Sequence, residues 1–177
     1  TLFPQKEGPS MNGQRFYKLI LIFKIMLDPD INFFMLEALN MADLAFQNNE
    51  VPVGAIIVKD RKIIGKGFNQ VIQHHSVSSH AEINAIYDAG QTLQNYRLID
   101  CDLFVTLEPC HMCAKAIVDA RINSLYFGAM EPKTGAIQSI DFFLDHDHLN
   151  HKVKYSGGYM SNQSANLLKK FFKSRRN

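Results

Sequence analysis

The sequence has no acidic residue in its last 30 positions, no long hydrophobic run and only three cysteines among its 177 residues. The longest apolar stretch, residues 16–27, is interrupted by Lys18 and Lys24 and is shorter than the roughly 18 residues that a membrane span needs. It lacks the small-residue cleavage site that would mark a secretory signal. Three cysteines give no disulfide framework, which is typical of a reducing compartment. We therefore predict a cytoplasmic protein that has no contact with a membrane.

Charge is divided unevenly along the chain. Residues 148–177 carry seven basic side chains and no acidic one, whereas residues 1–147 carry 12 basic and 17 acidic side chains, for net charges of +7 and −5. With 46% hydrophobic and 20% charged residues, the composition excludes a disordered chain and fits one globular domain. The basic end raises the question of an anionic partner.

The pattern along the chain predicts alternating strands and helices in one domain, residues 30–177, preceded by an N-terminal extension, residues 1–29, of unknown role. Ser79 is a candidate helix cap and Gly90 a candidate helix stop, and Pro109 stands where a helix should begin. Such alternation predicts an α/β layered sandwich around a mixed sheet. We expect helices or helical turns at 31–48, 80–89, 110–120, 141–144 and 167–172, and strands at 53–58, 63–68, 103–107 and 125–127, the first two strands being a hairpin through 59–62.

Two short segments carry the chemistry. His80-Ala81-Glu82 and Pro109-Cys110-His111-Met112-Cys113 match the H-x-E and P-C-x-x-C signature of zinc deaminases. Cysteines three apart in a helix present their sulfurs on one face, and the first turn of a helix favours thiolate over thiol. Together with the His80 imidazole they give three ligands and leave the fourth tetrahedral position for water, which is the pattern of a catalytic zinc.

Glu82 lies two residues after a ligand and is placed to move protons. Two thiolates nearly neutralise the charge of the metal, so we expect the water to need a base. Glu82 would take that proton and pass protons to the ring nitrogen and the departing ammonia. The reaction class predicted is hydrolytic deamination of an amino-substituted purine or pyrimidine.

The C-x-x-C pair also has other interpretations. It is compatible with a thioredoxin-like redox pair, or with a closed structural zinc site that takes Cys101 as its fourth ligand. His80 and Glu82 favour the catalytic site over both. Cys101 by itself is typical of a buried thiol, and we expect the remaining histidines, His111 included, to lie in loops or at the surface.

Further blocks resemble the bacterial tRNA-specific adenosine deaminase family, in register from about residue 31 to the C-terminus. The zinc signature alone indicates only the broader cytidine deaminase-like superfamily. The additional blocks are Val51-Pro52-Val53-Gly54-Ala55, Gly67-Phe68-Asn69, residues 95–100, Thr106-Leu107-Glu108-Pro109-Cys110, Phe127-Gly128-Ala129, Lys133-Thr134-Gly135-Ala136 and Leu149-Asn150-His151.

The resemblance implies a three-layer αβα sandwich with a central mixed sheet of about five strands, one Zn2+ per subunit and a homodimer. It also implies conversion of adenosine to inosine at the wobble position of a tRNA anticodon, whose unpaired bases leave the stack at low cost. On the family pattern His80, Cys110 and Cys113 are the zinc ligands and Glu82 is the proton shuttle. Asn69 hydrogen-bonds the nucleoside, and Val53 and Ala81 line its pocket.

Two features bear on RNA. The family commonly has Arg-Asp where this chain has Met130-Glu131, so Glu131 keeps an acid at a candidate substrate-binding position while a positive charge is lost. At the basic C-terminus, Phe171 and Phe172 are candidates for stacking on a base, and Arg175 and Arg176 for neutralising phosphates. The alternative for the two phenylalanines is the apolar stripe of a docking helix. For the whole protein, the alternative to a tRNA deaminase is deamination of a free base or nucleoside such as guanine or cytosine, or a non-enzymatic zinc or redox module that binds RNA.

Overall fold

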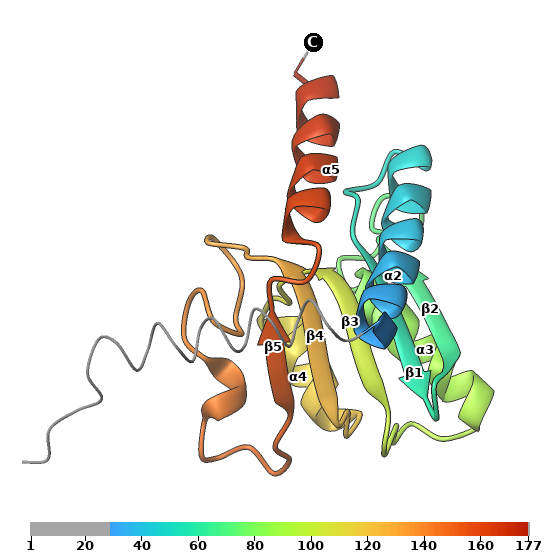
Figure 1. The fold of residues 1–177 in the computed structure, drawn as a ribbon, viewed down its shortest axis with the longest axis vertical. Helices are drawn as coiled ribbons and strands as arrows, with labels where there is room; N and C mark the ends of the chain where they lie inside the picture. The colour runs from blue at the N-terminus through green and yellow to red at the C-terminus, as the bar shows by residue number, and fades with distance from the viewer. Residues whose placement is uncertain (1–28, 177) are drawn as a thin grey trace, which may run out of the picture.

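The computed structural model describes residues 29–176 and contains one five-stranded sheet with helices on both faces (Figure 1). The hydrophobic stretch at 16–27 and nearly all of the extension at 1–29 lie outside the described residues. None of the helices within 29–176 is long and apolar enough to cross a membrane. The elements in chain order are α2 (Pro29–Gln47), β1 (Gly54–Lys59), β2 (Lys62–Phe68), α3 (Ala81–Leu93), β3 (Asp102–Leu107), α4 (His111–Asp119), β4 (Ser124–Ala129), the 3₁₀ turn η1 (Phe143–Asp145), β5 (Lys154–Gly157) and α5 (Ser161–Ser174).

The sheet is mixed, in the order β2-β1-β3-β4-β5. β1 pairs antiparallel with both β2 and β3, whereas β3, β4 and β5 run parallel. The β1–β2 hairpin turns at Asp60 and Arg61, both with positive φ, as expected for a tight hairpin turn. The predicted αβα sandwich around a mixed sheet is confirmed.

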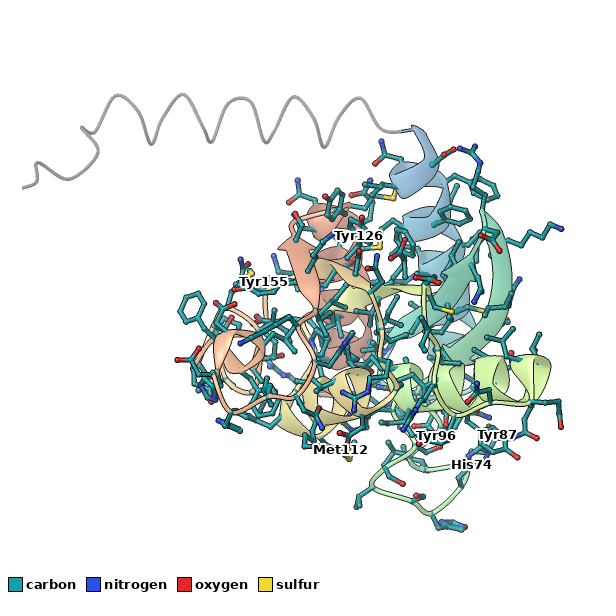
Figure 2. The ribbon with its side chains drawn as sticks, turned by 90° about the horizontal axis from the view of Figure 1, so that it is seen from below. His74, Tyr87, Tyr96, Met112, Tyr126 and Tyr155 are labelled. Carbon is teal, nitrogen blue, oxygen red and sulfur yellow. The ribbon has the colours of Figure 1, made fainter. Side chains whose placement is uncertain are left out.

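The layers follow from the alternation of side chains along the strands. Ile57 and Leu103 face the core beneath α3 and α4, whereas the neighbouring Ile56, Val58 and Phe104 face the core beneath α2. Figure 2 shows the sheet nearly edge-on, with Tyr126 on the α2 side and Tyr87 and Met112 on the opposite side. Each face of the sheet is therefore buried by its own pair of helices, α2 and α5 on one side, α3 and α4 on the other (Figure 1).

Several predicted boundaries differ from the structure. Gly90 lies inside α3, which continues to Leu93 and ends at Gln94 in the left-handed conformation. Ser79 does not cap that helix, because His80 occupies the N-cap and the Ser79 hydroxyl contacts the Asn84 side chain instead.

The other differences concern the second half of the chain. The expected helix at 141–144 is the single 3₁₀ turn Phe143–Asp145, and α4 begins one residue later than predicted. The edge strand β5, Lys154–Gly157, has no counterpart among the predicted strands, because its four residues include a lysine, a serine and a glycine rather than an apolar run.

Candidate active site

Three candidate metal ligands meet where two helices begin. His80 is the N-cap of α3 and Cys110 is the N-cap of α4, and Cys113 follows in the first turn of α4. The ligand atoms of the three side chains all lie within 4.8 Å of one another. His80 Nδ1 is 3.5 Å from Cys113 Sγ and 3.8 Å from Cys110 Sγ. Two sulfurs that face one imidazole nitrogen form a donor set suited to a metal that accepts nitrogen and sulfur ligands.

Burial and mutual contact shift the pKa values of this group. The hydrogen bond with Cys113 is the main cause that lowers the pKa of Cys110 to about 3. That same contact raises the pKa of the Cys113 thiol. The side-chain contact with Cys110 also raises the pKa of His80. The lowered pKa favours the thiolate form of Cys110 beside the imidazole.

Glu82 lies on the first turn of α3, two residues after His80, and its side chain is 4% exposed. Burial raises the pKa of the Glu82 carboxyl to about 7, the main cause being desolvation. A carboxyl group with that pKa is able both to accept and to release a proton near neutral pH.

A cavity of about 360 Å³ opens beside these residues, and it is large enough for one nucleoside. Val53, Asn69 and Glu131, three of the residues that the sequence analysis named for substrate binding, are among the residues that line it. The Asn69 Oδ1 atom accepts a hydrogen bond of 2.9 Å from the Ala81 backbone N–H, which leaves the Nδ2 group to donate to a ligand. The whole lining consists of Glu50, Val51, Val53, Asn69, Val71, Ile72, His80, Glu82, Leu107, Glu108, Cys110, Glu131 and Thr134.

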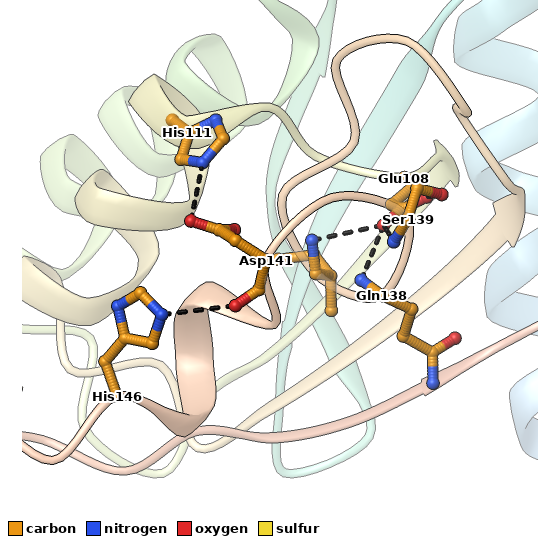
Figure 3. Close-up of polar contacts among 7 residues, drawn as sticks. Glu108, His111, Gln138, Ser139, Asp141 and His146 are labelled. Carbon is orange, nitrogen blue, oxygen red and sulfur yellow. Dashed lines mark hydrogen bonds and ion pairs between the residues drawn. The ribbon is translucent and has the colours of Figure 1, made fainter.

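Other candidate ligands lie elsewhere. Cys101 is buried and directs its thiol to the Ile99 carbonyl, 3.6 Å away, so it does not join the group formed by His80 and the other cysteines. His111 Nε2 lies 3.0 Å from an Asp141 carboxylate oxygen (Figure 3). A closed site with Cys101 as fourth ligand is therefore absent among residues 29–176.

Comparison with known proteins agrees with this geometry. The family model of MafB19-like deaminases matches residues 30–176. The tRNA-specific adenosine deaminase of Haemophilus influenzae is 45% identical over 140 residues, which cover 78% of this chain and 81% of that protein. The corresponding protein of Aquifex aeolicus is 43% identical over 145 residues, 82% of this chain and 95% of the relative. This chain belongs to the tRNA-specific adenosine deaminase family.

Solved structures give the same fold. A structure from a study of A-to-I editing by tRNA:A34 deaminases superposes with a TM-score of 0.74 at 41% identity and covers 76% of this chain and 98% of that one. A guanine deaminase from Nitrosomonas europaea superposes with a TM-score of 0.67 at 22% identity, over 81% of this chain and 84% of that one, which shows a shared fold.

The other residues predicted to bind substrate differ in burial, as Ala81, Phe171 and Phe172 show. The Ala81 side chain is fully buried in the core, and Ala81 reaches the site through its backbone N–H rather than as part of the cavity wall. Phe171 is 7% exposed and packs edge-on against Phe46 of α2, at 5.9 Å between ring centroids. This ring therefore docks α5 against α2, which is the alternative to stacking on a base. Phe172 remains exposed.

The basic C-terminus lies next to the segment that enters the cavity. Arg175 donates a hydrogen bond of 2.8 Å to the Asn49 carbonyl, and its guanidinium lies 5.1 Å from the centroid of the Phe171 ring. Asn49 directly precedes Glu50 and Val51 in the cavity wall. Arg176 is exposed. The charged end of α5 is thus attached to one wall of the cavity.

The sequence reasoning missed two buried carboxylates of the cavity wall. Glu50 is 2% exposed, and its Oε1 accepts a hydrogen bond of 2.8 Å from the Gln73 N–H. Glu108 is 3% exposed and accepts hydrogen bonds from the segment at 131–139. The one available signal was the position of Glu108 directly before Pro109-Cys110.

Proposed function

We propose that this protein is a zinc-dependent hydrolase that converts adenosine to inosine at the wobble position of a tRNA anticodon. The observation that carries the proposal is the meeting of His80, Cys110 and Cys113 with the buried Glu82 at one nucleoside-sized cavity. The 41–45% identity to tRNA-specific adenosine deaminases supports RNA as the substrate class.

His80 Nδ1 and the sulfurs of Cys110 and Cys113 would hold one zinc ion per subunit. The donor set fits zinc, since two thiolates and one imidazole leave a coordination position for water. Bound there, zinc supplies Lewis-acid activation of water.

Glu82 moves the protons of the reaction. Water adds its oxygen to C6 of adenine and gives one proton to the Glu82 carboxylate, which delivers it to N1. The proton of the hydroxyl group now on C6 then passes through Glu82 to the departing amine. The C6–N6 bond breaks, and the products are inosine and ammonia. The pKa of about 7 suits both directions of transfer at neutral pH.

Asn69 and Val53 orient the flipped nucleoside. The bond from the Ala81 N–H fixes the Asn69 amide, so that its Nδ2 group points one donor at the substrate. Val53, 5% exposed, supplies an apolar wall beside it. Burying an unstacked base against such a wall compensates part of the cost of extracting it.

An anticodon stem-loop is the partner that the charge distribution favours. The seven basic residues of positions 148–177 offer neutralisation of phosphates, and exposed Phe172 offers a surface for stacking. Glu131, at the rim of the cavity, is a further candidate contact. A free nucleobase has no phosphate for these cations to meet.

The assembly and the location follow from the same proposal. We propose a homodimer, on the family resemblance, and a cytoplasmic location, since a tRNA substrate is found there. Sedimentation equilibrium of the metal-loaded protein tests the dimer, for which a mass of twice 20.1 kDa is expected.

Release of ammonia from a panel of substrates tests the function against its alternative. Zinc-loaded protein is incubated with adenosine-containing anticodon stem-loop RNA, adenosine, cytosine and guanine. We expect ammonia from the RNA and little from the small molecules. Release from guanine or cytosine and none from RNA would support the free-base alternative, which shares the fold.

A further inference from the structure

The carboxylate of Glu108 receives five hydrogen bonds from one loop. Its Oε1 accepts the backbone N–H groups of Ile137, Gln138 and Ser139, at 3.1, 2.6 and 2.8 Å. Its Oε2 accepts the Glu131 N–H at 3.0 Å and the Ser139 hydroxyl. Figure 3 shows the Glu108 side chain pointing into the bend of this loop, beside Gln138 and Ser139.

The loop at 131–139 forms one wall of the cavity, through Glu131 and Thr134. The loop also forms backbone contacts with the segment that contains the candidate ligand Cys110. Gly135 forms a β-bridge with Cys110, and the Ala136 N–H donates to the Pro109 carbonyl at 2.8 Å. Glu108, three positions before the first residue of α4, thus connects the cavity wall to the start of that helix.

Gly135 makes this approach possible. A Cβ atom added at Gly135 would lie 2.4 Å from both Cδ and Oε2 of Glu108 and 2.6 Å from the Glu131 carbonyl oxygen. Those distances are shorter than any real carbon contact, and the Glu108 atoms are held by their hydrogen bonds. The glycine of the block Lys133-Thr134-Gly135-Ala136 is therefore explained by the space that the Glu108 carboxylate needs.

Glu108 has no free acceptor site for a proton of the substrate. An ionised carboxylate accepts about four hydrogen bonds, and five donors already surround this one. The proton transfers stay assigned to Glu82, which lies two residues after the candidate ligand His80. Glu108 can therefore affect the substrate only by holding the loop at 131–139 in place.

We propose that Glu108 is a positioning residue that holds the 131–139 loop as the substrate-facing wall of the cavity and thereby sets the affinity for the RNA substrate. This inference rests on the proposed function. It assigns the carboxylate no part in the proton transfers and none in holding the metal.

Glu108→Gln tests the role with almost no change in volume. The carbonyl oxygen of the new amide would keep the three donors at 137–139, whereas its NH2 group has no lone pair for the Glu131 N–H. We expect KM for the stem-loop to rise about 10-fold or more, the loss of one hydrogen bond to a charged group. We expect kcat to change less than KM, and zinc to stay at one per chain.

Two further variants and one control complete the series. Gly135→Ala displaces the same carboxylate and should raise KM to a similar extent. Ser139→Ala removes only the hydroxyl donor and should raise it less, and it also covers the case in which Glu108→Gln does not fold. Glu37→Gln removes a carboxylate of α2 that pairs with Lys66, away from the cavity wall, and should match the wild type.

Hydrogen exchange gives a readout that does not depend on catalysis. The amides of Glu131 and of residues 137–139 should exchange faster in Glu108→Gln than in the wild type, since their acceptor is weakened. An unchanged KM, or a loss of zinc and kcat with KM unchanged, would overturn the proposal. Wild-type protein that forms no inosine would contradict the proposed function, and the exchange rates would then test the hold on the loop separately.

Discussion

The Nδ1 atom of His80 lies 3.5 Å from the Sγ atom of Cys113, although 33 positions separate the two residues in the sequence. The contact exists because α3 and α4 lie side by side on one face of the sheet and both begin at the same edge. His80 and Cys110 occupy equivalent N-cap positions. Two helix starts therefore bring together a ligand set that neither segment has alone.

The three cysteines allow an internally controlled test of the metal site. Cys113→Ala should reduce bound zinc to well below one per chain, because two ligands do not hold the ion in competition with buffer. Cys101→Ala should leave zinc content unchanged, since that thiol contacts the Ile99 carbonyl instead. Atomic emission measures zinc per chain in both. Equal zinc loss in the two variants would contradict the assigned ligand set.

Glu82→Gln should separate chemistry from metal binding. The amide keeps the shape of the side chain but cannot accept a proton, so we expect kcat to fall by about 100-fold or more. Zinc content should stay at the wild-type value, because Glu82 is not among the three grouped ligands. The rate of inosine formation at saturating RNA measures kcat, and metal analysis measures the zinc content. Full activity in this variant would remove Glu82 from the mechanism.

Local sequence patterns predict most of the fold. The hairpin of β1 and β2, the apolar strand β3 and the helix after Pro109 each depend on neighbouring residues, and their predicted bounds agree with the structure within one or two positions. The strand β5 escapes such patterns because Lys154–Gly157 becomes a strand only by pairing with β4. The prediction that Gly90 stops a helix is wrong, since nothing local shows that α3 has room to continue for three more residues.

The two phenylalanines of α5 should behave differently. Phe171→Ala should lower the free energy of unfolding by about 3 kcal/mol, since its buried ring packs on Phe46. Phe172→Ala, at an exposed position, should change stability by no more than about 0.5 kcal/mol, while it weakens binding of the stem-loop if the ring stacks on a base. Urea denaturation and fluorescence anisotropy measure the two effects. Reversed results would contradict the packing of α5.

The contributions of Arg175 and Arg176 to RNA binding and to stability can be measured separately. Arg176→Ala should reduce the salt dependence of RNA binding, with the slope of log K against log salt falling by about 0.7. Its stability should match the wild type. Arg175→Ala should also lower the melting temperature, because it removes the hydrogen bond to the Asn49 carbonyl and the contact of the guanidinium with the Phe171 ring. A salt slope that neither variant changes would show that α5 carries no phosphate contact.

Two glycines test how α3 is held against the sheet. A Cβ at Gly67 would lie 2.2 Å from the Ala81 carbonyl oxygen and 2.4 Å from the Ala85 nitrogen, so Gly67→Ala should cost about 1–3 kcal/mol or more. A Cβ at Gly90 meets only the Asn95 carbonyl oxygen, at 3.5 Å. Gly90→Ala should therefore stabilise by about 0.5–1 kcal/mol as a helix-interior substitution. Urea denaturation of both variants measures the difference.

The candidate site was predictable only in part. The candidate metal ligands and Glu82 stand in short motifs with fixed spacing, so they can be identified from the sequence. Glu50 and Glu108 act on backbone groups 23 or more positions away, and a linear sequence contains no measure of such distances. The same limit applies to Phe171, whose partner Phe46 lies on a helix at the other end of the chain.

Inosine at the wobble position is the most direct measurement of the central claim. Zinc-loaded wild-type protein is incubated with an anticodon stem-loop that has adenosine at the wobble position, and with a matched stem-loop that has guanosine there and adenosine elsewhere in the loop. Mass spectrometry of the nucleosides should find inosine in the first RNA and little in the second, and Glu82→Gln should form it at about one-hundredth of the wild-type rate or less. No inosine in the first RNA, from protein with one zinc per chain, would contradict the account.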